Sequence, residues 1–465
     1  FKQKTAYEML RSLVGSEMCI RDREKYSMPI LNALRLALIV LTITLISNVS
    51  AEQYALVADG VIDGKSNDLL KGKAVIVTGS KITAIVDVNR IPKGAMKVNL
   101  PGTTLMPGMI NAHEHPLLYK NDYQNAHLQG SSAYKALLGL SNLQRLLQAG
   151  WTTIRVMGDG DVYYANQDIR KTIDAGIFIG PRLTGAAHYI SITGGGGDVN
   201  YFSPEQNVVA DGLIADGPDE IRKAIRKEIK YGSDWIKIMV TGAFMSVGDN
   251  PRNVSFSPEE LSAAIEEASR QNIPVAAHAH ATAGINQAVI AGARSIEHGS
   301  YLDEESIALM VEHQTYYVPT IYVGDYYANS GKLLAQSKND DFYLSFRDDW
   351  LVMIGKAHKA GVKIAVGSDL CGYAVESHVC AREFATLVEA GLSPMDAIKA
   401  GTSVGAELLQ WDDRIGSIEV NKLADIIAVP GNPLLDVSAL EKPVFVMKNG
   451  QIIINTLENY SAINN

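Results

Sequence analysis

The alternation of apolar and polar residues divides the chain into three regions. Residues 52–107 hold short alternating runs broken by turn residues, such as "GKAVIVTGSKITAIV", which is typical of β-strands. Residues 411–460 have the same pattern and add an Asn-Gly pair, which favours a hairpin turn. We therefore predict that both chain ends pair antiparallel into one small β-sandwich domain.

The middle region, residues 108–410, alternates apolar strand-like runs with helical stretches. Eight runs follow one another: "TLMPGMINAH", "GWTTIRVMG", "GPRLTGAAH", "DWIKIMVTG", "IPVAAHAHA", "GARSIEHGS", "TYYVPTIY" and "VKIAVGSDL". Helical segments such as "PEELSAAIEEASRQN", with Ser257 as its N-cap, lie between some of them. This alternation predicts an α/β fold with a parallel sheet, and eight units predict a (β/α)8 barrel of the TIM type.

The first 51 residues are expected to be separate from the fold. In residues 1–27, "SLVGSEMCIRDR" resembles translated sequencing-adapter read-through, so we expect a non-native extension there. Residues 28–51 combine Arg35, the apolar run "LALIVLTITLIS" and the ending "NVSA", the pattern of a signal peptide cleaved after Ala51. An uncleaved anchor is the alternative, although the apolar run is shorter than the roughly 20 residues of a spanning helix. We expect a periplasmic or secreted protein without stable membrane insertion.

Composition narrows the function classes. With 47% hydrophobic and 20% charged residues, the chain is able to bury a core of its own. A formal charge of -9, without a run rich in lysine and arginine, gives no basis for binding nucleic acid. Only Cys371 and Cys380 follow the predicted cleavage point, too few for a disulfide framework, although one bridge between them stays open.

Residues able to bind a metal follow several of the predicted strands. In "GMINAHEHP", His113 and His115 lie two residues apart, so on a strand their side chains point the same way. His278, His298 and Asp369 end other predicted strands. The carboxyl ends of barrel strands are where catalytic residues belong. Each residue alone also has a structural interpretation, such as packing of a histidine or helix capping by Asp369.

Lys237, in the apolar run "DWIKIMVTG", is harder to explain. A lysine in such a strand normally extends its ammonium group to water, and an ammonium group cannot bind a cation. It becomes a ligand only when carbon dioxide adds to the neutral amine and gives a carbamate with two oxygens. A carbamate that bridges two metals would explain the position of this lysine.

These motifs together resemble the amidohydrolase superfamily. The resemblance rests on "HEH", "WIKIMVTG", "VAAHAH", "SIEHG", "GSD" and "GSIEVNKLADIIAV", and it covers residues 54–455. It is strongest to the branch with Xaa-Pro dipeptidases, zinc carboxypeptidases, imidazolonepropionase-like proteins and ochratoxin-hydrolysing amidohydrolases. In members with the lysine of the fourth strand, that lysine is carboxylated and bridges two zinc ions.

The resemblance assigns a role to each candidate residue. It implies that His113, His115 and Asp369 bind the more buried metal, that His278 and His298 bind the other, and that carboxylated Lys237 is shared. A hydroxide between the metals would attack the carbonyl, and Asp369 would pass the proton to the leaving nitrogen. His280, on the same face of its strand as His278, is a catalytic or substrate-contacting candidate.

Two positions depart from the pattern of this branch. Members often have TGGHGD after the third strand, whereas this chain has "TGGGGD", with Gly196 in place of the histidine. His188 lies near enough to contact substrate instead, although a structural role is equally open. Asn421 replaces a usual glycine in "SIEVNKLAD", which is tolerable because Asn accepts a left-handed φ better than most residues.

We therefore predict a secreted hydrolase with two divalent metal ions, most simply Zn²⁺, that cleaves an amide bond to a C-terminal amino acid. The substrate would be a dipeptide or an N-acyl amino acid, including ochratoxin-like amides, and we expect a homo-oligomer. One alternative is a mononuclear deaminase or cyclic-amide hydrolase of the same superfamily. The other is a non-catalytic secreted scaffold. The metal count per chain, two, one or none, separates these three.

Overall fold

The computed structural model describes residues 52–120, 122–330, 340–370 and 376–463. The predicted extension, the predicted signal peptide and Cys371 lie outside the described residues. Within the described part, no helix combines the length and apolarity needed to cross a membrane.

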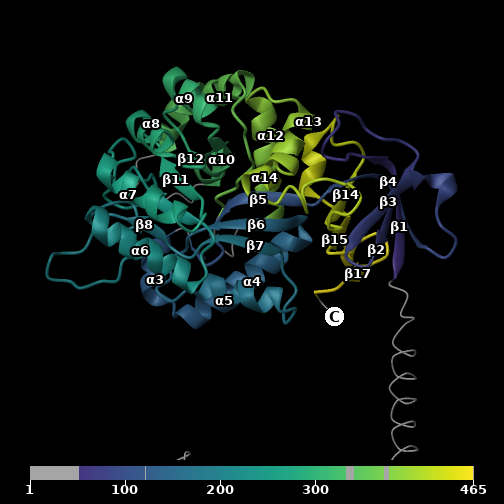
Figure 1. Cartoon of the computed structure of the whole chain (residues 1–465), viewed down its shortest axis with the longest axis horizontal. Helices are drawn as coiled ribbons and strands as arrows, with labels where there is room; N and C mark the ends of the chain where they lie inside the picture. Colours follow the sequence, from purple (N-terminus) through teal and green to yellow (C-terminus); the bar gives the residue numbers. More distant parts are fainter. Residues whose placement is uncertain (1–51, 121, 331–339, 371–375, 464–465) are drawn as a thin grey trace, which may run out of the picture. The chain divides into compact units, whose positions relative to one another are not determined.

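Both chain ends contribute to one eight-stranded sheet (Figure 1). In spatial order its strands are β17 (Tyr460–Ser461), β16 (Gln451–Asn455), β15 (Phe445–Lys448), β14 (Ile426–Pro430), β4 (Met96–Pro107), β1 (Gln53–Val61), β2 (Lys73–Thr78) and β3 (Lys81–Asp87). The antiparallel pair β4–β14, with Leu105 opposite Ala428, joins the two ends as predicted. The pair β1–β4 is parallel, contrary to the antiparallel expectation. After the β2–β3 hairpin on one side of β1, the chain returns along the other side of β1 in the same direction.

The middle of the chain supplies parallel strands. A three-stranded sheet contains β5 (Met109–Glu114), β6 (Trp151–Met157) and β7 (Arg182–Ala186). A six-stranded sheet has the order β13 (Tyr316–Val318), β12 (Ser295–His298), β11 (Val275–Ala279), β10 (Ile236–Met239), β8 (Tyr189–Ser191) and β9 (Leu213–Ile214). The neighbouring strands of both sheets run parallel, as the strand–helix alternation predicts.

The eighth predicted strand connects these two sheets. On one side, Tyr317 of β13 donates to Lys363 O and accepts from Ala365 N, both at 2.9 Å. On the other, Ala112 N of β5 donates to Val366 O at 2.8 Å, and Asp369 N donates to His113 O at 2.9 Å. The segment therefore lies between the last strand of one sheet and the first strand of the other.

Helices cover the outside of these strands (Figure 1). They are α3 (Tyr123–Gln129), α4 (Ser132–Gln148), α5 (Ala165–Asp174), α6 (Gly217–Tyr231), α7 (Pro258–Ser269), α8 (Thr282–Ala291), α9 (Glu304–His313), α10 (Ile321–Ser330), α11 (Asp340–Ala360), α12 (Arg382–Glu389), α13 (Pro394–Ala400) and α14 (Ser403–Leu408). Ser257 caps α7 in a capping box with Glu260, which confirms its predicted role. Three short 3-10 helices, Val88–Arg90, Ser377–Ala381 and Val437–Glu441, complete the described elements.

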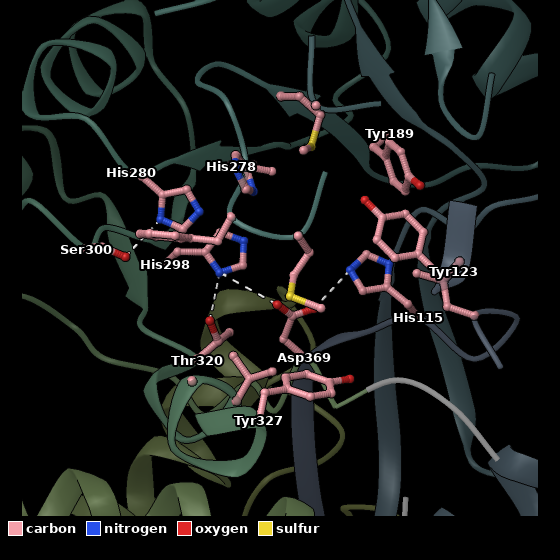
Figure 2. Close-up of a pocket in the computed structure, with 18 of the residues that line it drawn as sticks. His115, Tyr123, Tyr189, His278, His280, His298, Ser300, Thr320, Tyr327 and Asp369 are labelled. Atoms are coloured by element: carbon pink, nitrogen blue, oxygen red, sulfur yellow. Dashed lines mark hydrogen bonds and ion pairs between the residues drawn. The ribbon is translucent and has the colours of Figure 1, made fainter. Parts of the chain in front are cut away.

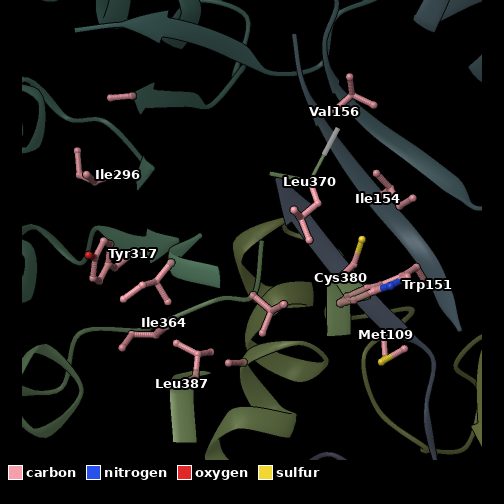
Figure 3. Packing of buried hydrophobic residues seen from close by; sticks show 14 of the residues in the cluster. Met109, Trp151, Ile154, Val156, Ile296, Tyr317, Ile364, Leu370, Cys380 and Leu387 are labelled. Atoms are coloured by element: carbon pink, nitrogen blue, oxygen red, sulfur yellow. The ribbon is translucent and has the colours of Figure 1, made fainter. Parts of the chain in front are cut away.

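Apolar side chains from strands and helices form the main core (Figure 3). Trp151 of β6 stacks on Phe384 of α12, with ring centroids 5.8 Å apart. Cys380 is buried in the same cluster, and burial raises the pKa of its thiol far above the usual value.

The hairpin that joins β15 to β16 has the predicted Asn-Gly turn, with φ of 50° at Asn449 and 76° at Gly450. A Cβ atom on Gly450 would lie 1.9 Å from the carbonyl oxygen of Gly79. Gly431 also has a positive φ, 63°, but has nothing within 4 Å of that position.

We predict that Gly450→Ala lowers the free energy of unfolding by about 3 kcal/mol, because it combines left-handed strain with overpacking. The matched variant Gly431→Ala should lose only about 1 kcal/mol, from the left-handed φ alone. Urea unfolding of both variants measures the difference. Equal losses would contradict the packing argument.

Candidate metal centre

The predicted ligands meet at the carboxyl ends of the barrel strands (Figure 2). Two groups of three residues each bring their ligand atoms within 4.8 Å of one another: His113, His115 and Asp369, and His278, His280 and His298. The first group is the set that the resemblance assigns to the more buried metal. The second adds His280 to the two histidines assigned to the other metal.

The first group has the spacing of a metal site. His113 Nε2 lies 3.2 Å from His115 Nε2, and Asp369 Oδ1 lies 3.2 Å from His115 Nε2 and 3.5 Å from His113 Nε2. Ligand atoms 2.0–2.1 Å from a tetrahedral zinc ion are about 3.3 Å apart. The three atoms are therefore separated as ligands of one such ion would be.

The other ring nitrogens of this group are held by acceptors. His113 Nδ1 donates to Glu297 Oε2 at 2.7 Å, and His115 Nδ1 donates to the carbonyl oxygen of Gly158 at 2.5 Å. Such bonds fix the ring orientation and leave the Nε2 lone pairs directed at a metal.

The histidines of the second group are fixed in the same way. His278 Nε2 bonds to the carbonyl oxygen of Gly242 at 3.1 Å. His280 Nδ1 lies 2.8 Å from Ser300 Oγ, and His298 Nδ1 lies 2.7 Å from Thr320 Oγ1. One ring nitrogen of each histidine, Nδ1 of His278 and Nε2 of the other two, is left for a ligand.

The backbone is strained at three strand ends of this centre. His298, Thr320 and Asp369 have φ of 71°, 50° and 51°, in the left-handed region that non-glycine residues rarely adopt. In a regular strand, Glu297 and His298 would point to opposite faces. The left-handed φ lets both side chains face the barrel interior, so this local strain is part of how the centre is assembled.

Lys237 is buried, with 1% of its surface exposed, and it lines the same pocket as the histidines. Burial lowers the pKa of its amino group to about 8. Within the described part of the chain, no hydrogen bond or ion pair is formed by this amino group. Such a lysine has a larger neutral fraction near neutral pH than an exposed lysine, and the neutral amine is the form that reacts with carbon dioxide.

A pocket of about 1170 Å³, including its open mouth, leads down to these residues. Most of its wall is apolar or aromatic. These wall residues come from loops, from β8 and β10, and from α3, α10 and α11: Leu118, Tyr123, Tyr189, Met239, Ala243, Phe244, Met245, Val323, Tyr327 and Trp350. The aromatic-rich segment that follows the seventh predicted strand contributes Val323 and Tyr327 to this wall. The other lining residues Phe244, Trp350 and Lys120 reach the pocket from distant segments, and no sequence pattern indicated them.

His188 is placed away from this pocket. It is absent from the described residues that line the cavity, and its Nδ1 lies 2.7 Å from Glu228 Oε1 of α6. The structure therefore gives His188 a structural partner and leaves its predicted substrate contact without support.

The glycine-rich loop "TGGGGD" approaches the pocket at Gly196. Three of its backbone N–H groups are already donated to other acceptors, those of Gly194, Gly195 and Gly197. These three N–H groups are therefore not free to bind an anion such as a substrate carboxylate. Asn421, the other departure, has the expected left-handed backbone with φ of 75°.

Sequence reasoning missed the residues that orient the ligands. Glu297, Ser300 and Thr320 each contact a histidine of the centre, and Arg155 contacts Glu297. Of these residues, only Glu297 could have been found from the sequence. The motif "SIEHG" places this acidic residue inside an apolar strand, directly before a predicted ligand.

Comparison with known proteins places the chain in a family. The model of the amidohydrolase family matches residues 104–453. Ochratoxinase from Aspergillus niger is 31% identical to this chain, over 95% of this chain and 93% of that protein. The crystal structure of A. niger ochratoxinase matches 87% of this chain and 96% of its own, with a TM-score of 0.77 and 30% identity.

A second solved structure has a similar fold and a similar level of sequence identity. The crystal structure of a Xaa-Pro dipeptidase with bound methionine in the active site matches 86% of this chain and 99% of its own, with a TM-score of 0.77 and 33% identity. These matches confirm the predicted fold class, a barrel with a β-rich domain.

Proposed function

Because the chain belongs to the amidohydrolase family, and so is a metal-dependent hydrolase of amide bonds, we propose that it releases a C-terminal amino acid from a dipeptide or an N-acyl amino acid. One observation carries the proposal. The members of the two ligand groups other than His113, together with the buried Lys237, line a pocket whose walls are otherwise mostly apolar.

We propose that this centre takes two Zn²⁺ ions and that carboxylated Lys237 bridges them. The spacing of the first group, the oriented histidines of the second and the unpaired buried amine all support two ions rather than one. A mononuclear site would leave the second group and Lys237 without a role. Divalent ions bound there would lower the pKa of a water molecule and polarise the scissile carbonyl.

Asp369 is the proposed proton carrier. Its Oδ1 faces both histidines of the first group, and its Oδ2 lies 3.9 Å from His298 Nδ1 of the second (Figure 2). Its side chain keeps 21% exposure, so it reaches the pocket. From there the carboxylate can accept a proton from the attacking water and donate it to the leaving nitrogen. His280, also in the pocket, is the second catalytic candidate.

The pocket walls indicate the type of substrate. Aromatic and apolar side chains suit a bulky acyl group, including an ochratoxin-like amide. The substrate's free carboxylate needs a cation or donor, and among the described lining residues Lys120 and Lys237 are the only lysines or arginines. Since Lys237 is assigned to the metals, we propose that Lys120, with His280, binds the carboxylate. A relative named ochratoxinase and a dipeptidase with bound methionine support this class.

The proposal includes a location outside the cytoplasm. Its support is the sequence pattern of residues 28–51, which combines an apolar run with a small-residue ending.

We predict that Lys237→Ala loses bound metal and activity together, because the bridging ligand is removed. A short carboxylic acid added to this variant should restore part of both. Metal content by mass spectrometry and turnover are the measurements. Lys135→Ala is the matched control, since Lys135 is also buried but bonds to Gly160 O outside the pocket, and it should retain its metal. A fully active Lys237→Ala would refute the bridge.

Asp369→Asn tests the proton carrier. Asn still offers one oxygen to a metal but accepts no proton, so we expect most of the metal to be kept and turnover to fall by about 10² or more. Steady-state kinetics with parallel metal analysis separates the two effects. Near-normal turnover would show that the proton takes another route.

The substrate class is tested by presenting the zinc-loaded protein with dipeptides and N-acyl amino acids, each as the free acid and as its C-terminal amide. We expect a sharply higher KM, or no turnover, for the amides. Lys120→Met should raise KM for the free acids and leave the weak reaction of the amides unchanged. Equal rates on acid and amide would contradict carboxylate recognition, and hydrolysis of lactones or phosphoesters alone would contradict the amide assignment.

A further inference from the structure

An ion pair lies inside the barrel beneath the first ligand group, and no step of the proposed mechanism uses it. Arg155 of β6 and Glu297 of β12 are fully buried, and Arg155 Nη2 donates to Glu297 Oε1 at 2.8 Å. The other donors of Arg155 bond to Ala112 O at 2.6 Å and Ser295 Oγ at 3.0 Å. Its guanidinium group also lies over the ring of Trp235, 4.5 Å from the centroid.

Such a pair adds little to stability by itself. Removing two charges from water costs several kcal/mol per ion, and buried ion pairs often stabilise no better than apolar residues of the same volume. A fully bonded pair in the core therefore suggests a role besides packing.

The two oxygens of Glu297 have different partners. Oε1 accepts from both Arg155 Nη2 and Ser295 Oγ, the latter at 2.5 Å. Oε2 accepts from His113 Nδ1 at 2.7 Å. An ionised carboxylate accepts hydrogen bonds and donates none. His113 must therefore carry its proton on Nδ1.

The position of this proton decides whether His113 can act as a ligand. With the proton on Nδ1, the lone pair of Nε2 points toward His115 Nε2 and Asp369 Oδ1, 3.2 and 3.5 Å away. In the other tautomer, an N–H group would point to the same place and exclude a cation. One hydrogen bond at the far side of the ring thus controls the ligand atom.

We propose that Glu297 is a positioning residue that fixes the Nδ1–H tautomer of His113, and that Arg155 holds the Glu297 carboxylate in place for this task. The inference rests on the metal centre of the proposed function, because it assigns these two residues to the ion of the first group.

Glu297→Gln is the direct test. Arg155 Nη2 and Ser295 Oγ both donate to the position of Oε1, so the amide oxygen of Gln must occupy it. The amide NH₂ group then faces His113 Nδ1. His113 is then forced into the Nε2–H tautomer. We expect the zinc content to fall from two ions per chain to one, with affinity at the lost site weaker by about 10-fold to 100-fold. Metal analysis after equilibration in a zinc buffer and competition with a chelator give these values.

The chain offers a matched control in Glu228. Its Oε1 lies 2.7 Å from His188 Nδ1, and its Oε2 accepts from Ser233 Oγ and from backbone N–H groups. Glu228→Gln therefore makes the same exchange at a buried histidine that belongs to neither ligand group. We expect this variant to hold two zinc ions with the affinity of the unmodified protein.

A second measurement avoids reliance on one variant. In the metal-free protein, ¹⁵N chemical shifts of the histidine rings report the tautomer of His113, assigned by comparison with His113→Gln. We expect Nδ1–H, and an Nε2–H tautomer would overturn the inference even where Glu297→Gln does not fold.

The outcomes separate the two proposals. Two zinc ions bound at unchanged affinity in Glu297→Gln would overturn the role of Glu297 and leave the metal centre intact. An unmodified protein that binds no zinc would instead refute the centre itself. Loss of zinc in both Glu297→Gln and Glu228→Gln would show a general effect on the barrel and would also overturn the specific role.

Discussion

Five imidazoles, one amine and one carboxylate converge at one end of the parallel barrel, where all of them except the carboxylate are buried. Burial lowers the pKa values of His113, His278 and His298 well below the usual range, so these rings stay neutral and keep a lone pair to donate. Neutral imidazole rings whose lone pairs all point inward stabilise one another very little. A divalent cation bound between them would supply the favourable interaction that the neutral rings lack.

The barrel holds these side chains in conformations that isolated strands would not adopt. His298, Thr320 and Asp369 leave their strands with left-handed backbone angles, each of which is unfavourable alone. The surrounding sheet fixes them, because the segment that carries Asp369 is bonded on one side to β13 and on the other to β5. At Asp369, bonds to both neighbouring strands can therefore hold the strained backbone.

Two buried carboxylate–histidine pairs in the same barrel serve different ends. Glu297 holds His113, whose free nitrogen faces the other ligands, whereas Glu228 holds His188 outside the described pocket lining. The chemical unit is the same in both places. What differs is the direction of the second ring nitrogen, which depends on where each strand lies in the barrel.

The sequence was enough to predict most of the strands and helices and the candidate residues at the strand ends. It could do so because periodicity and turn residues act locally, as the Ser257 cap and the Asn449–Gly450 turn illustrate. Lys237 was also identified as a candidate ligand from its local sequence, because a lysine inside an apolar strand is unusual. The tertiary structure alone decided the parallel β1–β4 pair, the direction of His188, the walls formed by Phe244 and Trp350, and the contact of Glu297 with His113. These depend on which segments, far apart in sequence, come together and on φ at single residues such as His298, and neither is encoded in a local pattern.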